Sequence, residues 1–218
     1  MSAFQIERGQ SGAEVDVRSY NLLLGGCLFY GFALNYLLVR FFSGAFASMN
    51  PLLFIIAYFV LCLGGSVICN RAETFGAAFL GYNMIVVPIG GLLACLLPYY
   101  SESVISTAFL GTALVAGLMI VFAAIRPEAF RGLGRTLFIA LAVSVVVDLV
   151  LTLFGVFSTA MDWIITLIFA GYVGFDWTRA NECYPSSVNA VRSACALYMD
   201  IINIFVRLLS IISRNRRN

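Results

Sequence analysis

The sequence predicts an all-α, polytopic membrane protein, and three observations predict it. Of 218 residues, 61% are hydrophobic and only 11% are charged, whereas a soluble domain carries about 25% charged residues. Apolar runs long enough to cross a hydrocarbon core of about 30 Å recur along the chain. The hydrophilic blocks between them are too short to form a separate soluble domain. We therefore expect one helical domain whose surroundings are the lipid bilayer.

Seven spans are predicted, at about 20 apolar residues each. Residues 1–19 mix both charge signs with Gly and Ser and contain no apolar core, so a disordered cytoplasmic arm is expected rather than a cleavable signal peptide. The membrane domain then covers residues 20–212, and a basic tail covers residues 213–218. The predicted spans are Tyr20–Phe42, Pro51–Cys69, Phe75–Leu97, Val104–Ile125, Thr136–Phe157, Asp162–Trp177 and Val188–Ile212.

The connections between these spans are short, so neighbouring spans should run antiparallel. Residues that favour turns or helix ends mark each connection: Ser43-Gly44, Asn70-Arg71, Pro98, Arg126-Pro127, Ser158 and Pro185. Glycine recurs within most spans, which allows helices to approach closely in lipid. Pro88 predicts a kink within the third span.

Arginine is distributed unevenly over the loops. Basic residues fall in alternate loops, at Arg71, at Arg126, Arg131 and Arg135, and at Arg179. The positive-inside rule places these loops and the N-terminus in the cytoplasm of a multi-pass protein. Seven full spans would place the tail residues Arg214, Arg216 and Arg217 outside. Either the last segment does not cross completely, or the earlier loops dominate.

Several kinds of chemistry lack the residues that they need. The chain contains no His, which removes the usual ligand of zinc or copper and the usual group that titrates near neutral pH. The six cysteines show no CxxC spacing and lie mostly in apolar runs, so we interpret them as packing residues. We therefore expect no enzyme, no catalytic residue, no bound metal or cofactor, and no nucleic-acid partner.

Two aspartates, Asp176 and Asp200, lie within the last two apolar segments, where a carboxylate is costly and is rarely without a task. Their midpoint, residue 188, is close to the turn marked by Pro185, so an antiparallel hairpin would place both at similar depth. If they meet, one proton is shared and the pair titrates as a unit. The alternative for Asp176 is a helix end facing water beside Arg179.

Two further charges are candidates. Asp148 lies well inside the fifth span, as an additional pathway carboxylate or as a hydrogen-bond partner of a Ser, Asn or Tyr on a neighbouring helix. Arg71 closes the second span, either as a latch for one of the aspartates or as an interfacial anchor.

The run GYVGFDW, followed by ALYMDIINIFVRLLSI, resembles the Bax inhibitor-1 family (transmembrane BAX inhibitor motif proteins), especially its bacterial members. The matching residues are Phe175-Asp176 at the end of the sixth helix and Leu197-Tyr198-Met199-Asp200-Ile201-Ile202-Asn203-Ile204-Phe205 on the seventh. Tyr198 and Asn203 therefore support the motif. The segments Arg131–Val147 and Phe79–Leu93 also resemble helices five and three of the family. Phe175 stands where Tyr is common.

The resemblance implies six helices surrounding a central seventh, in a bacterial inner membrane. It also implies a pH-sensitive calcium leak in which Asp176 and Asp200 sense protons and Arg71 is their basic partner. Calcium and protons would then be transported or sensed species, not cofactors.

Two other functions compete with the leak. A regulatory protein would act on a membrane-protein partner, such as a protease or a component of a stress response, through its arm and tail. An intramembrane aspartyl protease would also place two aspartates on adjacent helices, but residues 197–200 lack the Gly-x-Gly-Asp motif of such enzymes.

Overall fold

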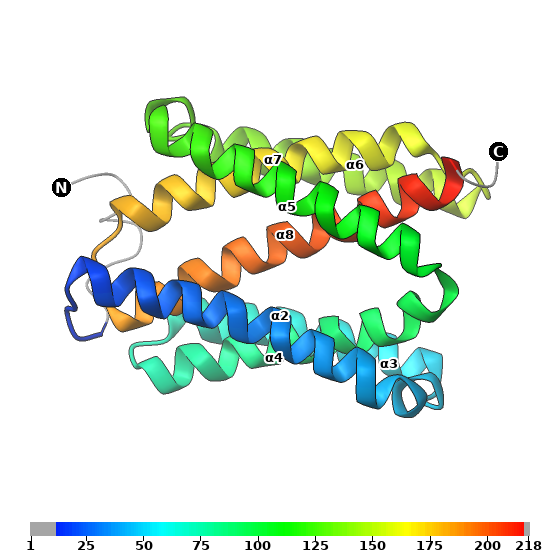
Figure 1. Cartoon of the computed structure of the whole chain (residues 1–218), viewed down its shortest axis with the longest axis horizontal. Coiled ribbons are helices and arrows are strands. Elements are labelled where there is room, and N and C mark those ends of the chain that lie inside the picture. The colour runs from blue at the N-terminus through cyan, green and yellow to red at the C-terminus, as the bar shows by residue number, and fades with distance from the viewer. Residues whose placement is uncertain (1–11, 216–218) are drawn as a thin grey trace. The chain divides into compact units, whose positions relative to one another are not determined.

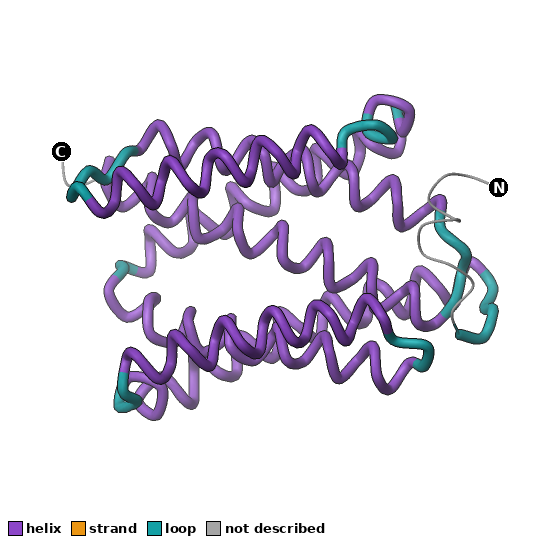
Figure 2. The backbone as a smooth tube through the Cα atoms, turned by 180° about the vertical axis from the view of Figure 1, so that it is seen from behind, coloured by secondary structure: helices purple, strands orange, loops and turns teal. Residues whose placement is uncertain are grey.

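The computed structural model describes residues 12–215, and this part of the chain is helical almost throughout (Figure 2). The α-helices, labelled in Figure 1, are α2 (Val17–Ala47), α3 (Pro51–Arg71), α4 (Phe75–Leu96), α5 (Glu102–Ile125), α6 (Gly134–Leu153), α7 (Thr159–Glu182) and α8 (Ser187–Asn215). Two short 3₁₀ helices, η1 (Leu97–Tyr99) and η2 (Pro127–Ala129), follow α4 and α5. The predicted all-α class is confirmed.

Six of these helices are long and apolar enough to cross a membrane: α2, α3, α4 with its 3₁₀ extension, α5, α6 and α8. The seventh, α7, is also long, but it carries Asp162, Asp176, Arg179 and Glu182 along its length. Charged side chains lower the mean hydropathy of a helix, and within lipid they require partners inside the protein. The number of charges alone does not set α7 apart, because α8 also carries four charged residues, Arg192, Asp200, Arg207 and Arg214.

The predicted ends of the first, fifth and sixth spans were wrong. The sixth span, predicted to end at Trp177, continues to Glu182. Ser43-Gly44 does not interrupt the first span, because α2 continues to Ala47 before the turn that leads to Asn50. A glycine within a helix is tolerated in lipid, where no water competes for the backbone. The fifth span, predicted to reach Phe157, ends at Leu153 because Gly155 adopts a φ of +73°, which favours glycine and stops the helix.

The described residues form two compact units. The first contains the residues up to Tyr99 together with Glu182–Tyr198, and the second contains Tyr100–Asn181 together with the residues from Met199 onward. The helix α8 therefore contributes its first part to one unit and its second part to the other.

Close backbone contact holds α3 and α4 together in the first unit. A Cβ atom built on Gly81 would lie 2.5 Å from the backbone nitrogen of Cys69 and 2.7 Å from the carbonyl oxygen of Gly65. Small residues at such a crossing let helices pack by van der Waals contact in lipid. Pro88, predicted as a kink, lies inside α4 and is buried.

Aromatic and polar side chains fill the centre of this unit. Tyr82 and Tyr198 are fully buried, and their rings meet edge to face with centroids 5.7 Å apart. The Tyr82 hydroxyl donates to the carbonyl of Cys27 at 2.9 Å, and the Asn35 amide donates to the Tyr198 hydroxyl at 2.5 Å. These bonds satisfy polar groups that would otherwise be costly to bury.

The segment before α2 is anchored to the loop before α8. Glu14 pairs with Ser186 in an isolated antiparallel bridge, and the Val15 N–H donates to the carbonyl of Pro185 at 3.0 Å. The Tyr184 hydroxyl donates to the Glu14 carboxylate at 3.1 Å. Residues 14–19, which belong to the predicted arm, thus contact the loop before α8 or begin α2, and residues 1–11 of that arm lie outside the described part of the chain.

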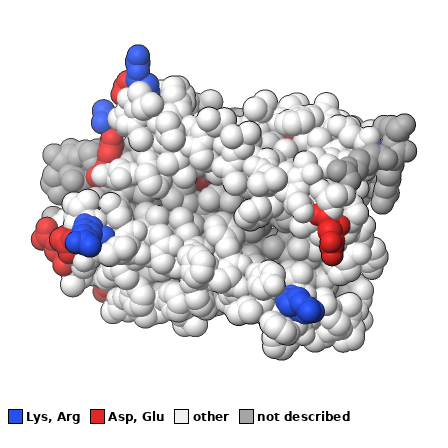
Figure 3. All heavy atoms as spheres, in the orientation of Figure 1, with Lys and Arg blue, Asp and Glu red and all other residues white. Residues whose placement is uncertain are grey.

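Aromatic rings pack against glycines in the second unit. Phe130, in the connection between α5 and α6, lies where a side chain on Gly174 of α7 would stand, and the Phe175 ring lies 2.7 Å from the position of a Cβ on Gly134. Elsewhere these helices present apolar side chains outward: only 6% of the membrane-crossing window of α6 is buried. Most of the face seen in Figure 3 is uncharged. This surface suits lipid chains.

Candidate functional site

The second unit brings Asp176 of α7 and Asp200 of α8 together. Their side chains are hydrogen-bonded to each other, and each residue is buried, with 7% of Asp176 and 5% of Asp200 exposed. A hydrogen bond between two carboxyl groups requires a proton on one of them. Burial of both groups makes double ionisation costly. The arrangement is therefore one that suits two carboxyl groups sharing a proton.

The remaining oxygen of Asp200 is not satisfied within the described residues. Its Oδ2 atom is buried and has no hydrogen-bond partner there. A buried carboxylate oxygen without a donor is costly. It is therefore a position at which a cation or a proton would be stabilised.

One basic side chain of the same unit approaches the pair. The Arg179 Nη1 atom lies 4.0 Å from Asp176 Oδ1, one helical turn along α7. The Arg179 side chain is 27% exposed, so its charge is partly screened by surrounding solvent. Asp176 is thus buried rather than directed into water, in contrast to the alternative interpretation of a solvated helix end.

A helical hairpin positions these groups. The turn between α7 and α8 is short, and Asp176 and Asp200 lie symmetrically about residue 188. Asp162 and Arg214, which form an ion pair at 3.0 Å, lie symmetrically about the same residue. The two helices therefore keep one antiparallel register over their length within the second unit.

The two motif residues have different roles in the structure. Tyr198 belongs to the first unit, where it accepts the hydrogen bond from Asn35 and packs against Phe32 of α2, with ring centroids 5.4 Å apart. Asn203 belongs to the second unit, and its amide donates to the carbonyl of Met199 one turn earlier. Neither contact involves an aspartate.

Arg71, the predicted latch, is an exposed residue at the C-terminal end of α3, in the first unit. A different arginine occupies the interior next to that helix end. Arg192 of α8 is 7% exposed and donates from Nε to the carbonyl of Cys69 at 3.2 Å and from Nη2 to that of Ala72 at 2.6 Å. A cation at the C-terminus of a helix stabilises its unsatisfied carbonyls. The latch role of Arg71 stays a prediction.

Asp148 has a partner that was not among the expected ones. Its Oδ2 atom accepts a hydrogen bond from Arg207 Nη1 at 2.9 Å, so its partner is a cation of α8 and not a Ser, Asn or Tyr. The same nitrogen donates to Asp162 Oδ1 at 2.9 Å. The other oxygen of Asp162 accepts from the Ser210 hydroxyl at 3.0 Å and pairs with Arg214.

This second cluster was missed from the sequence. Asp162 was interpreted as the outer end of a span, yet it is 3% exposed. One signal was present: Asp200, Asn203, Arg207, Ser210 and Arg214 recur at spacings of three and four residues, which places them on one face of a helix. The identity of the partners on α6 and α7 was not available from that spacing.

Among the described residues, no group of three or more His, Cys, Asp or Glu side chains could together hold a metal ion. The acid pair supplies two carboxyl groups, whereas Ca²⁺ takes six to eight oxygen ligands in a resident site. The arrangement therefore suits transient contact with a cation better than permanent binding.

Comparison with known proteins agrees with this architecture. The family model described as "Inhibitor of apoptosis-promoting Bax1" matches residues 13–217. An uncharacterized membrane protein of Streptococcus pyogenes is 31% identical over 135 residues, 58% of each chain. An uncharacterized protein of Deinococcus radiodurans is 30% identical over 150 residues, 64% of this chain and 63% of its own.

A third relative, from Helicobacter pylori, is 33% identical over 104 residues, 46% of this chain and 44% of its own. The chain thus matches less than two thirds of the length of these relatives. No solved structure matches it significantly. Because the family model extends over nearly the whole chain, this membrane protein belongs to the Bax inhibitor-1 family.

Proposed function

We propose that the protein is a proton-gated leak pathway for cations, with calcium as the transported ion and the Asp176–Asp200 pair as the proton sensor. One observation carries the proposal: two buried carboxyl groups of neighbouring helices share a hydrogen bond, and one oxygen of Asp200 remains without a donor among the described residues. Protons and cations are the species that such oxygens attract.

The charge of the pair changes with pH. When both groups are protonated, neither carries charge, and the attraction for a cation is weak. Loss of protons leaves negative charge in a low-dielectric region, which strengthens that attraction and also the interaction with Arg179. Proton binding and cation entry are therefore coupled at one position. Calcium ions, protons and the surrounding bilayer are the proposed partners, and no enzymatic step is proposed.

Calcium flux into liposomes tests this mechanism. The Asp200→Asn variant keeps the shape of the side chain but cannot lose a proton, so its flux should vary several-fold less than wild type between about pH 5 and pH 8. Flux is measured with an encapsulated calcium indicator at matched protein density. Glu102→Gln is the matched control, because it removes the same charge at an exposed position of the second unit.

An unchanged pH dependence in Asp200→Asn, with wild-type flux present, would exclude the pair as the sensor. A wild-type protein that carries no calcium at any pH would exclude the leak itself. In that case the regulatory alternative gains support, in which the protein acts on a membrane-protein partner.

A further inference from the structure

The C-terminal half of α8 carries a second ionic site that the acid pair does not use. Arg207 donates from one nitrogen, Nη1, to Asp148 of α6 and to Asp162 of α7, at 2.9 Å each. The two carboxylate oxygens therefore lie within twice that distance of each other. Arg214 pairs with the second oxygen of Asp162, and Ser210 donates to the same atom.

The site has equal numbers of acids and bases. Asp148 and Asp162 contribute two negative charges, and Arg207 and Arg214 contribute two positive charges. All four belong to the second unit, and three of its helices supply them. Removal of one charge therefore gives the site a net charge of known sign.

The four charged side chains of this second ionic site are not all buried. The Asp162 side chain is 4% exposed, but those of Asp148, Arg207 and Arg214 are 24%, 26% and 33% exposed. Asp148, Arg207 and Arg214 are therefore partly accessible at the surface of the second unit, whereas Asp162 is enclosed. The C-terminal end of α8, red in Figure 1, lies near the start of α7, whose first turn carries Asp162.

The site and the acid pair are aligned. Arg207 follows Asp200 by seven residues, which is two turns of helix, about 10 Å, and places both on the same face of α8. Asp162 and Asp176 likewise lie on α7. A cation that reaches the acid pair along this face from the C-terminal end of α8 meets the Arg207 guanidinium first.

We propose that Arg207, held between Asp148 and Asp162, is an electrostatic barrier that sets how fast cations reach the acid pair. This inference rests on the proposed leak function and adds a gate residue to it. The negative charges of the two carboxylates offset the positive charge of the Arg207 guanidinium. The net charge of the site therefore controls the local cation concentration. The acid pair sets the pH response, and this site sets the rate.

Charge substitutions and calcium flux test the barrier. Arg207→Gln leaves the site one charge more negative and should raise flux about three-fold or more at constant pH, because cations then gather there. Asp148→Asn leaves it one charge more positive and should lower flux by a similar factor. The double variant Asp148→Asn/Arg207→Gln restores neutrality and should return flux to within about two-fold of wild type. All three should keep the wild-type pH dependence.

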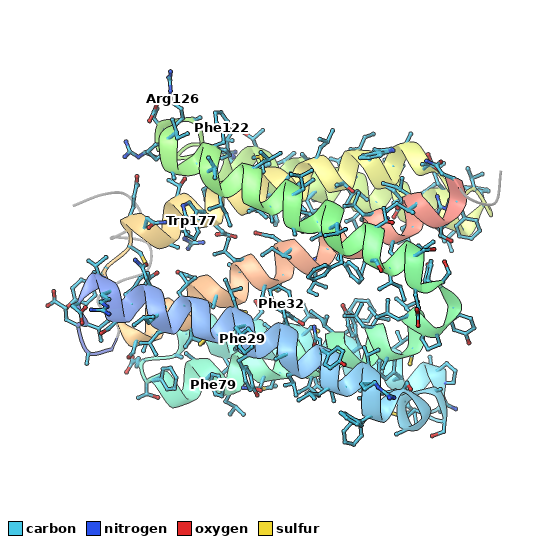
Figure 4. The ribbon with its side chains drawn as sticks, viewed as in Figure 1. Phe29, Phe32, Phe79, Phe122, Arg126 and Trp177 are labelled. Atoms are coloured by element: carbon cyan, nitrogen blue, oxygen red, sulfur yellow. The ribbon has the colours of Figure 1, made fainter. Side chains whose placement is uncertain are left out.

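Arg126→Gln is the matched control, because Arg126 is 68% exposed and points away from the end of α5 (Figure 4). Thermal unfolding in detergent is recorded for every variant. If the site were only a structural clamp, both single variants would lose flux and stability together, and that result would overturn the barrier. Wild-type flux that persists unchanged in Arg207→Gln would also overturn it while leaving the leak intact, whereas absent wild-type flux would reject the leak instead.

Discussion

A single glycine, Gly81, sets how closely α3 and α4 approach each other, and this leads to a prediction about stability. Gly81→Ala should lower the free energy of unfolding by about 2 kcal/mol, because the new methyl group would meet the backbone of Cys69 and Gly65, which cannot rotate away. Thermal unfolding in detergent measures the effect. Gly76→Ala, in the same helix and with open space at its Cβ position, should leave the midpoint unchanged or raise it slightly.

If both alanine variants raised the midpoint alike, helix propensity, and not the close approach of backbones, would govern this position. The two glycines differ in their neighbours: backbone atoms of α3 lie against Gly81, and none lie against Gly76.

The contact between Asp176 and Asp200 was easier to predict from the sequence than the close helix contact at Gly81. A carboxylate in an apolar, helix-length run is costly, so each of Asp176 and Asp200 predicts a partner. The position of the turn near residue 188 predicted which carboxyl would be that partner, and the two side chains are hydrogen-bonded to each other. For Arg207 no such local cue existed, because its partners lie on two other helices.

Helix ends were the least predictable part of each element. Apolar length correctly predicted that seven helical segments exist, because a bilayer demands long helices. It did not predict that α2 extends through Ser43-Gly44. Small and polar residues that often end a helix in water are tolerated within a helix in lipid. The end of α6 at Leu153 depends on a glycine with positive φ, which composition alone does not indicate.

The start of α2 should respond to acid. Asp16 caps this helix, and hydrogen bonds from the Ser19 side chain and the Ser19 N–H lower the pKa of Asp16 below its ordinary value of 3.8. A carboxyl with a lowered pKa stabilises the helix end above that ordinary value, and the contribution is lost as pH falls through the lowered pKa. Amide exchange in the first turn of α2 should therefore accelerate relative to the rest of the helix as the sample is acidified below about pH 4.

Asp16→Asn retains a capping oxygen without a titrating group, so its exchange rates should lose this additional acid dependence. Faster exchange on acidification in both proteins alike would show that the cap does not titrate as proposed.

For the whole molecule, the second unit makes the orientation of the C-terminus testable. The ion pairs of Asp162 with Arg207 and Arg214 place the end of α8 at the same end of that unit as the connection between α6 and α7. The connection between α5 and α6, which carries Arg126 and Arg131, lies at the other end of α6. Within the described residues, the ion pair with Asp162 offsets the charge of one tail arginine, Arg214, which bears on the conflict between the tail charges and seven full spans.

Cysteine labelling in intact cells checks this topology. The cysteine of a Glu128→Cys variant should stay protected from a membrane-impermeant maleimide, and that of a Thr159→Cys variant should react, because the positive-inside rule places the arginine-rich connection in the cytoplasm. The six native cysteines are buried or partly buried, and unsubstituted protein supplies the background. Equal labelling at both positions would contradict α6 as a complete span, and the reverse pattern would invert the orientation.

The constant register of α7 and α8 has a mechanical consequence. The same two helices, α7 and α8, make both contacts: Asp176 with Asp200, and Asp162 with Arg214. A slip of α8 along α7 by one turn, about 5.4 Å, would part both contacts in a single displacement. A distance probe attached beside either contact would therefore record the same event, because both contacts belong to the same pair of helices within the second unit.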